Sequence, residues 1–235
     1  MPMAVVDFHS HILPRIDDGS RSTEMTAEML SNAAVQGIDI MVATPHFYAD
    51  STTIDRFLRH RERAYLATQP IAEAKKIQVI CGAEVAFFPG MSRADDIEQL
   101  CIGDTSLMMV EMPFRAWTDR DLREMELMLN RGIQPVIAHL ERFYRFQEDR
   151  GMIPALVDMP VYVQINAECL LRWSTRGQAL RLFRNGEAHL LGSDCHNVSS
   201  RPENLKEGRS VLSKKLGELI LRQMDDLSSS LLGVE

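Results

Sequence analysis

The segment DFHSHILPRIDDG, residues 7–19, places two histidines and three carboxylates within thirteen positions. Imidazole and carboxylate side chains together, without thiolates, are typical ligands of Mn, Fe or Zn, and they also serve as general acids and bases. A single His-x-His pair is weak evidence, because chance supplies one in many chains of this length. The segment therefore predicts a metal site only if other parts of the chain bring further ligands to the same place.

Polar side chains of this kind recur where other apolar runs end. In chain order they are His9 and His11, His46, Glu84, Glu111, His139, Asn166 with Glu168, and Asp194 with His196. Any one of them could be a satisfied core residue or a helix N-cap. However, five of the seven histidines stand at such ends, and we interpret the other two, His60 and His189, as structural. Eight or nine ligands exceed the needs of one ion, so the pattern predicts two or three ions with one bridging carboxylate.

Seven apolar runs rich in Val, Ile and Leu alternate with stretches of helical periodicity. They cover residues 4–8, 38–44, 77–83, 106–112, 134–139, 161–167 and 188–194. Near-continuous apolar runs of this length are typical of parallel strands buried on both faces. Seven strand–helix units favour a barrel, since no G-x-G-x-x-G or G-K-[ST] loop supports an open doubly wound sheet. The carboxyl ends of barrel strands, where the polar side chains fall, are the usual location of active sites.

Helix signals separate the runs. Helices are expected over 24–36, over 120–131 after a Thr118-x-x-Asp121 capping box, before Gly186, and over 203–227. Glycine directly after an apolar-periodic stretch is a common helix stop, and the capping box is a common start. The tail LSSSLLGVE is expected to fray.

Composition narrows the class of protein. The 235 residues are 45% hydrophobic, which is enough for one core, so we expect a single domain over 1–235. A net charge of −7 without a basic run argues against a nucleic-acid binder. Four scattered cysteines, Cys81, Cys101, Cys169 and Cys195, predict free thiols in the cytoplasm. We expect neither a signal peptide nor insertion into a membrane, because no apolar run approaches the roughly 20 residues that span a bilayer.

The ordered set of polar residues resembles the PHP family (polymerase and histidinol phosphatase), and within it the metal-dependent tyrosine-protein phosphatases of the CpsB/YwqE type. The resemblance rests on HSHILPRIDDGS, ATPH, CGAE, PVIAHLERF and SDCHN followed by RP, and it covers nearly the whole chain. It implies an α/β fold, a distorted (β/α)7 TIM-like barrel of PHP type. The implied activity is hydrolysis of phosphotyrosine by a metal-bound hydroxide, in the regulation of capsule or exopolysaccharide synthesis.

The resemblance also implies a trinuclear site. One ion would take His9, His11, Glu84 and Asp194, a second would share Glu84 and add Glu111 and His139, and a third would use Asp18, His46 and His196. Manganese is the metal expected first, with Fe, Zn or Mg as alternatives. Arg142 and Arg201 would bind phosphate, since guanidinium groups match its geometry, although surface salt bridges are the alternative. Asp17 would neighbour the ligands, and Asp7 either orients a ligand histidine or is structural.

The partners that the resemblance implies are phosphotyrosine proteins, in particular a bacterial tyrosine kinase of polysaccharide synthesis. It implies neither nucleic acid nor membrane insertion, and it leaves a homo-oligomer open. Histidinol-phosphate phosphatase, or another PHP-type phosphoesterase, is the main alternative activity. A PHP-type domain kept as a binding module is a non-catalytic alternative, which the complete ligand set disfavours.

A thiol mechanism is a further alternative. Cys195 and Arg201 have the C-x5-R spacing of cysteine-dependent phosphatases, but no glycine lies between them to help the backbone surround a phosphate. An amidohydrolase would share the barrel and the His-x-His pair. Its binuclear form often uses a lysine at a strand end, and no run here ends in lysine.

Overall fold

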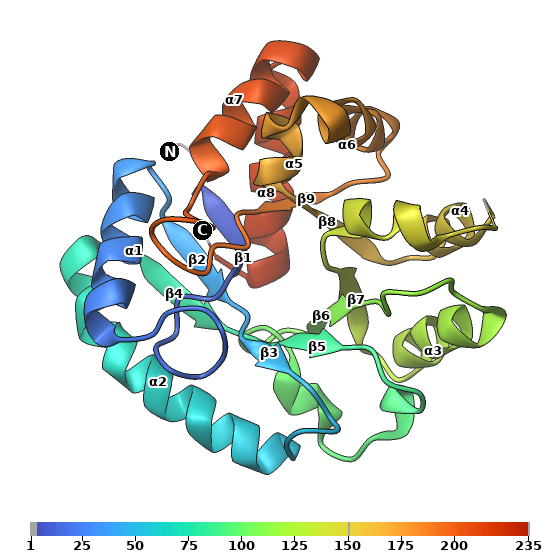
Figure 1. Cartoon of the computed structure of the whole chain (residues 1–235), viewed down its shortest axis with the longest axis horizontal. Helices are drawn as coiled ribbons and strands as arrows, with labels where there is room; N and C mark the ends of the chain where they lie inside the picture. Colours follow the sequence, from blue (N-terminus) through green and yellow to red (C-terminus); the bar gives the residue numbers. More distant parts are fainter. Residues whose placement is uncertain (1–3, 150, 235) are drawn as a thin grey trace.

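A computed structural model describes residues 4–149 and 151–234. Parallel strands curl around a common axis, and helices surround them (Figure 1). The strands are β1 (Val6–Ser10), β2 (Ile40–Ala43), β3 (His46–Phe47), β4 (Gln78–Cys81), β5 (Glu84–Ala86), β6 (Leu107–Glu111), β7 (Gln134–Ile137), β8 (Tyr162–Asn166) and β9 (Leu190–Gly192). The helices are α1 (Thr23–Val35), α2 (Ile54–Lys75), α3 (Asp119–Asn130), α4 (Met152–Val157), α5 (Ala167–Leu171), α6 (Trp173–Asn185), α7 (Leu205–Leu216) and α8 (Glu218–Leu232).

The seven predicted strands are all present, and two of them continue, after a break, into short strands that lie beyond the predicted ends. β2 and β3 form one run broken at Thr44-Pro45, and β4 and β5 form another broken at Gly82-Ala83. The strand orders β1-β2-β4 and β3-β5-β6-β7-β8-β9 therefore join through these two runs. β9 returns to β1, since the N–H of Asp194 donates to the carbonyl of His9 at 2.8 Å. The distorted barrel is confirmed, with its irregularity concentrated at the two breaks.

Two apolar layers hold the barrel together. The inner layer includes alternate residues on the strands, together with Ala138 directly after β7, that face the barrel interior; the strand residues are Val6, Phe8, Ile40, Val42, Leu107, Met109, Val136 and Leu190. The outer layer packs the opposite strand faces against the helices. Leu227, Leu231 and Leu232 of α8 also contact the inner layer, so this helix contributes to the barrel core. Burying such side chains contributes roughly 1.5–3 kcal/mol each.

The predictions of one long helix over 203–227 and of a frayed tail after it were wrong. Gly217 interrupts the helix with φ 93° and ψ 163°, a backbone conformation that side chains with a Cβ rarely adopt. The break turns the chain so that α8 runs on to Leu232, burying Ser228 and Ser229 of the supposed tail. Apolar periodicity continues on both sides of the glycine, so the pattern alone did not reveal the turn.

The other predicted helices are present with ends shifted by a residue or two. Ser22 caps α1 by accepting from the N–H of Met25 at 3.3 Å. Asp121 caps α3 by accepting from the N–H of Thr118 at 2.8 Å, and α6 ends at Gly186 with φ 74°. Within residues 4–149 and 151–234, no helix has both the length and the apolar character that crossing a membrane requires.

Candidate metal centre

A bulge in β1 turns His9 toward the barrel interior. Phe8 belongs to the inner apolar layer, so strict strand alternation would point His9 at the helices. The pairing with β2 slips by one residue between Asp7 and Ser10. Bulges commonly redirect a side chain beside an active site. Here the redirected ring of His9 reaches Gln164 of β8, with Nδ1 3.1 Å from Oε1.

The loop after β1 folds back over His11. A Cβ on Gly19 would lie 2.3 Å from the His11 carbonyl oxygen, so only glycine fits this approach. The N–H of Ser20 donates to the same carbonyl at 3.0 Å. The folded loop places Asp17 against the His11 ring, with Oδ2 2.7 Å from Nδ1. It also brings Asp18 to the open side of the histidine cluster.

Asp7 was expected either to orient a ligand histidine or to be structural, and its contacts favour the structural role. Its carboxylate accepts from the N–H of Ser193 at 2.8 Å and from the Ser193 hydroxyl at 2.5 Å. It also accepts from the backbone N–H of His9 at 3.3 Å. No histidine ring bonds to it within the described residues, so it ties β1 to the segment after β9.

The first group of candidate ligands meets at the barrel axis. Nε2 of His9 and Nε2 of His11 lie 3.1 Å apart. Oε2 of Glu84 is 3.3 Å from the first nitrogen and 3.4 Å from the second. Oδ1 of Asp194 is 3.7 Å and 3.4 Å from the same two nitrogens. All four side chains are buried.

The donor set of this group fits a cation. Burial lowers the pKa of His11, but its bonds to Asp17, Asp194 and Glu84 outweigh that effect and raise the pKa well above its ordinary value. The surroundings thus favour positive charge, which a metal ion would supply in place of a proton. Oε2 of Glu84 is also buried among ring nitrogens of His9, His11 and His46, but no aligned hydrogen bond from the described residues reaches it. Buried polar atoms rarely remain unpaired, so a ligand of this oxygen is expected.

A second group shares Glu84. Its Oε1 lies 2.7 Å from Nε2 of His139, and Oε1 of Glu111 lies 3.5 Å from that nitrogen. Burial and the charge of Glu84 raise the pKa of Glu111 to about 7, and a shared cation would remove that repulsion. His139 has φ 33°, a left-handed conformation uncommon outside glycine. Such strained residues concentrate at functional sites.

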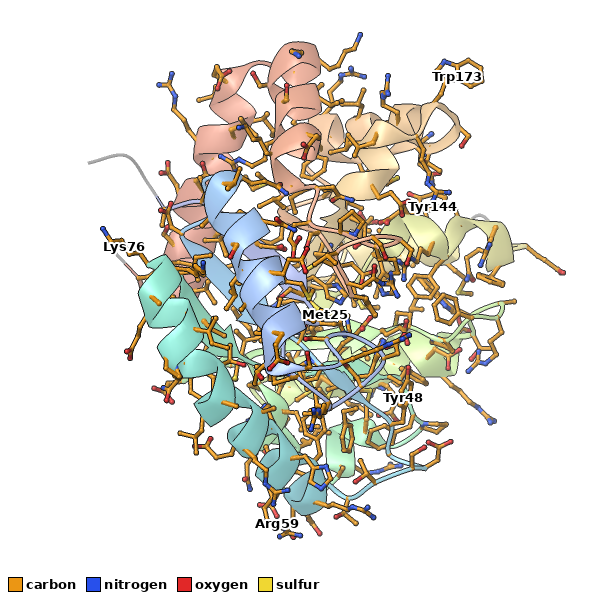
Figure 2. All side chains as sticks on the ribbon, turned by 60° about the vertical axis from the view of Figure 1, so that its left-hand side comes forward. Met25, Tyr48, Arg59, Lys76, Tyr144 and Trp173 are labelled. Atoms are coloured by element: carbon orange, nitrogen blue, oxygen red, sulfur yellow. The ribbon has the colours of Figure 1, made fainter. Side chains whose placement is uncertain are left out.

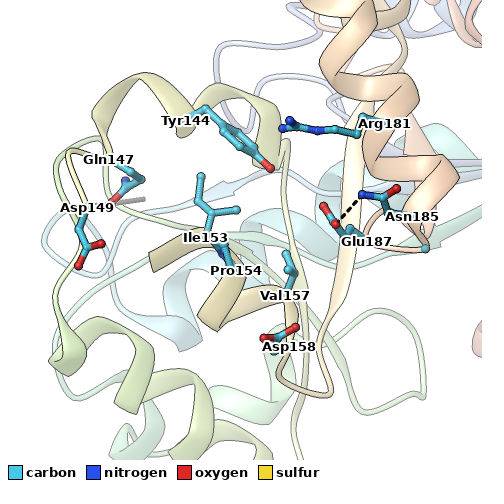
Figure 3. Close-up of a pocket in the computed structure, with 11 residues that line it drawn as sticks. Tyr144, Gln147, Asp149, Ile153, Pro154, Val157, Asp158, Arg181, Asn185 and Glu187 are labelled. Carbon is cyan, nitrogen blue, oxygen red and sulfur yellow. Dashed lines mark hydrogen bonds between the residues drawn. The ribbon is translucent and has the colours of Figure 1, made fainter. Parts of the chain in front are cut away.

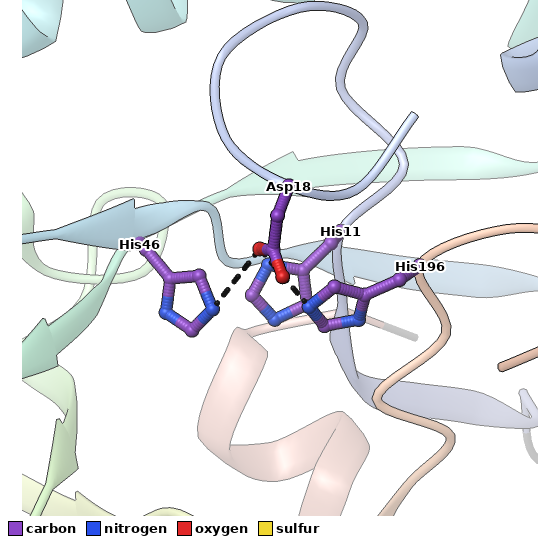
Figure 4. A group of neighbouring side chains, drawn as sticks. All are labelled: His11, Asp18, His46 and His196. Carbon is purple, nitrogen blue, oxygen red and sulfur yellow. Dashed lines mark ion pairs between the residues drawn. The ribbon is translucent and has the colours of Figure 1, made fainter. Parts of the chain in front are cut away.

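The third group brings together His11, Asp18, His46 and His196 (Figure 4). Oδ1 of Asp18 lies 3.4 Å from Nε2 of His46 and 3.4 Å from Nε2 of His196, and its side chain is 67% exposed. Burial and the charge of His11 lower the pKa of His196 to about 4, so its ring is neutral and able to bind a metal. His11 belongs to this group as well as to the first, and His46 also lies 2.9 Å from Oε2 of Glu84. The groups therefore overlap.

Asp194 links the histidines to the two candidate phosphate-binding arginines. Its Oδ1 faces the rings, while its Oδ2 accepts from Arg142 at 2.5 Å and pairs with Arg201 at 2.8 Å. The arginine side chains are 34% and 37% exposed, so both reach the surface beside the cluster. The amide of Asn166 donates to Oδ2 at 2.8 Å. Asp194, with φ 53°, is the second candidate ligand in the left-handed region.

The structure brings all nine predicted ligand residues and both arginines together at the carboxyl ends of the strands, while their ligand roles remain predictions. Sequence reasoning missed Gln164, whose oxygen contacts the His9 ring and accepts from the N–H of His139 at 2.8 Å. A lone glutamine inside the run VYVQIN was the available signal. Glu168 points elsewhere and pairs with Arg172.

His60, His189 and Cys195 lie outside the three ligand groups of the described residues. Nδ1 of His189 accepts from the N–H of Val163 at 3.1 Å, in line with a structural role. His60 lies on α2 outside the cluster. Burial, together with Glu203 and Asp7, raises the pKa of Cys195 well above its ordinary value. A buried thiol that resists ionisation is a poor nucleophile, which disfavours the thiol mechanism.

Comparison with known proteins gives relatives along the whole chain. A family model described as "Capsular polysaccharide synthesis, CpsB/CapC" matches residues 5–227. The tyrosine-protein phosphatase CpsB of Streptococcus pneumoniae is 26% identical over 228 residues, which cover 91% of each chain. The tyrosine-protein phosphatase YwqE of Bacillus subtilis (strain 168) is 29% identical over 221 residues, covering 91% of this chain and 85% of YwqE.

Solved structures agree with the sequence relatives. A chain from the work on "YwqE from Bacillus subtilis and CpsB from Streptococcus pneumoniae, unique metal-dependent tyrosine phosphatases" has a TM-score of 0.86 at 26% identity, covering 97% of this chain and 94% of that one. The phosphotriesterase homology protein of Escherichia coli shares the fold alone, with a TM-score of 0.61 at 11% identity and 99% of each chain covered. Because the family model spans almost the whole sequence, the chain belongs to the CpsB/CapC family of capsular polysaccharide synthesis.

Proposed function

We propose that this chain is a metal-dependent protein-tyrosine phosphatase that regulates capsule or exopolysaccharide synthesis. The observation that carries the proposal is the overlap of three ligand groups through His11, His46 and Glu84, with two arginines converging on Asp194. Membership of the CpsB/CapC family supports the same activity. A phosphate at this place would meet the ligand cluster on one side and guanidinium groups on the other.

The residues of the chain have separable tasks in this scheme. His9, His11, Glu84 and the other candidate ligands would hold the ions, which when bound offset the negative charge of the phosphate and lower the pKa of coordinated water. Arg142 and Arg201 would bind the phosphoryl oxygens through planar donor forks. Asp17 and Gln164 hold the rings of His11 and His9 through Nδ1, which leaves each Nε2 directed at the cluster.

Two half-exposed aromatic side chains favour an aryl phosphate. Tyr48 is 43% exposed and stacks on His46, with ring centroids 5.4 Å apart. Phe114 is 46% exposed and stacks toward His139, with centroids 6.4 Å apart. These rings flank the ligand groups and would contact the phenyl ring of phosphotyrosine. Tyrosine is also a good leaving group, since its pKa is about 10, so a strong general acid is dispensable.

Several finer features belong to this proposal. We infer about two to three ions per chain, with manganese the metal expected first. We infer one domain over 1–235, supported by an apolar cluster that runs from Ile12 to Met224. A cytoplasmic location is supported by free thiols at all four cysteines. A tyrosine kinase of polysaccharide synthesis is the proposed substrate, and the description of the family supports the link to polysaccharide synthesis.

A substrate panel tests the activity. The purified protein, with defined metals, is given a phosphotyrosine peptide, the same peptide with phosphoserine, and histidinol phosphate. We expect the phosphotyrosine peptide to show the highest kcat/KM. A much higher kcat/KM for histidinol phosphate would replace the proposal with the histidinol-phosphate phosphatase alternative, and no turnover of any phosphate ester would favour a binding module.

A further inference from the structure

A pocket of about 410 Å³ adjoins the metal centre and shares two side chains with it. Arg142 lines this pocket and also donates to Asp194 at 2.5 Å. Asn166 lines it too, and its side-chain nitrogen donates to the same carboxylate at 2.8 Å. A substrate chain with its phosphate beside Arg142 therefore has this pocket as its immediate neighbour.

The pocket carries an excess of positive charge. Arg142, Arg145 and Arg172 line it together, and we call it the arginine pocket. Of its two carboxylates, Glu141 accepts from the buried N–H of Asn166 at 3.3 Å and so faces the protein interior. The other carboxylate, Glu168, is already paired with Arg172.

Arg145 is the cation left available for a ligand. In the described part of the chain it forms no ion pair, and its guanidinium lies over the Phe146 ring at 4.7 Å. Arg145 lines the pocket and is exposed, so its charge is accessible from solvent. A flat guanidinium held over a ring keeps its edge donors free for a carboxylate or a phosphate.

Resting on the proposed phosphatase function, we propose that the arginine pocket binds an anionic side chain of the substrate, close in sequence to the phosphotyrosine. The ligand chemistry is a carboxylate or a second phosphate, both of which suit paired guanidinium donors. The pocket would thereby select phosphotyrosines that lie in acidic or multiply phosphorylated segments.

A neighbouring cavity has the opposite charge and limits where the anion can bind. Tyr144 lines this cavity of about 790 Å³ as well as the arginine pocket. Figure 3 shows the residues that line the cavity. Asp149, Asp158 and Glu187 line it, with Arg181 as the cation among its lining residues. An anionic side chain is therefore attracted between the metal centre and Tyr144 and repelled beyond it.

The test compares matched phosphotyrosine peptides on the metal-loaded protein. One peptide has glutamate beside the phosphotyrosine, one has a second phosphotyrosine there, and one has glutamine. p-Nitrophenyl phosphate, which is too small to reach the arginine pocket, reports the basal activity. The variants are Arg145→Ala, Arg145→Glu and Arg172→Ala.

Arg59→Ala is the matched control. Like Arg172, Arg59 pairs with a carboxylate four residues earlier and is mostly exposed, at 62% against 66%. Arg59 lies near the start of α2, far from Tyr144 (Figure 2).

We expect the unmodified protein to prefer the anionic peptides over the glutamine peptide by roughly fivefold to tenfold, through KM. Arg145→Ala and Arg172→Ala should each reduce that preference several-fold, Arg145→Glu should abolish it, and p-nitrophenyl phosphate turnover should stay unchanged. A preference for only one anionic peptide identifies whether carboxylate or phosphate is the natural ligand. Equal kcat/KM for all three peptides, or a preference that survives Arg145→Glu, would overturn the inference while leaving the phosphatase activity intact. Failure of the proposed function would show instead as no turnover of any substrate.

Discussion

Oδ2 of Asp17 lies 2.7 Å from Nδ1 of His11, and both side chains are buried. Burial raises the pKa of Asp17, but the hydrogen bond and charge of His11 outweigh it and lower the pKa to about 2. The ionised carboxylate fixes the ring so that Nε2 points at Glu84 and Asp194. A residue that is not itself a candidate ligand thus sets the geometry of one that is.

Removing this carboxylate should weaken metal binding without unfolding the protein. For Asp17→Ala we expect the affinity for Mn²⁺ to fall about 10- to 100-fold, because partners that orient ligands contribute on that scale. Metal titration followed by calorimetry measures the affinity. Asp104→Ala, at an exposed carboxylate in the loop before β6, is the control and should bind normally. Unchanged affinity in Asp17→Ala would show that the bond to His11 does not support the site.

The thiol and metal schemes make opposite predictions at neighbouring residues. Cys195 is buried and its pKa is raised, so Cys195→Ser should keep most activity, with small losses from packing. His196→Ala should lose bound metal and nearly all activity, because it removes a candidate ligand. Phosphotyrosine hydrolysis and metal content are measured on both variants. An inactive serine variant beside an active alanine variant would support the thiol mechanism.

Phe114 should raise kcat/KM more for aromatic phosphate esters than for aliphatic ones. Its ring packs on the Phe143 ring, with centroids 5.0 Å apart, and 46% of the residue stays exposed beside His139. Phe114→Ala should lower kcat/KM for a phosphotyrosine peptide by about 3- to 10-fold, since aromatic pairs contribute about 0.5–1.5 kcal/mol. The phosphoserine peptide should lose less. Trp173→Ala, a change at a 90% exposed ring on α6, is the control. An equal loss of kcat/KM on both peptides would mean that Phe114 does not contact the aryl ring of the substrate.

Glu203 should make the folded state less stable as the pH rises. Burial and the charge of Asp7 raise its pKa to about 7, from an ordinary value of 4.5. Asp7 and Cys195 are the titratable groups that face it. Between these pH values the folded protein retains a proton that the unfolded chain has released, so the free energy of unfolding falls as pH increases.

The variant Glu203→Gln removes this titration and tests the pH dependence. Its free energy of unfolding should match that of the unmodified protein near pH 4.5 and exceed it by on the order of 2–3 kcal/mol above pH 7. Denaturant unfolding across that range, at constant metal concentration, measures the difference. Glu207→Gln, at an exposed position on α7, is the control. A stability difference independent of pH would contradict the raised pKa.

The strand pattern and the residues of the candidate site could be read from the sequence, because both follow from local order. Buried parallel strands are apolar along their whole length, and barrel sites lie at their carboxyl ends. His46, Glu84 and His139 were therefore identifiable from position alone. Which of these residues belong to the same ligand group was harder to predict from the sequence. His46 lies between Glu84 and Asp18, so it adjoins two groups and not one.

Features that depend on the path of the backbone could not be predicted from the sequence pattern. The bulge after Asp7 changes which way His9 faces, and no residue type marks it. The break at Gly217 redirects α8 although apolar periodicity continues across it. Gln164 supports two histidines only because β8 lies between β7 and β9, and β9 returns to β1 in the barrel. Each of these depends on contacts between residues far apart in the chain.

Hydrolysis of a phosphotyrosine peptide during metal re-loading tests the central claim most directly. Protein stripped with a chelator would be titrated with Mn²⁺ while turnover and ions per chain are followed together. We predict background turnover in the stripped protein and recovery that tracks the binding of about two to three ions per chain. Full turnover by rigorously stripped protein would contradict the account.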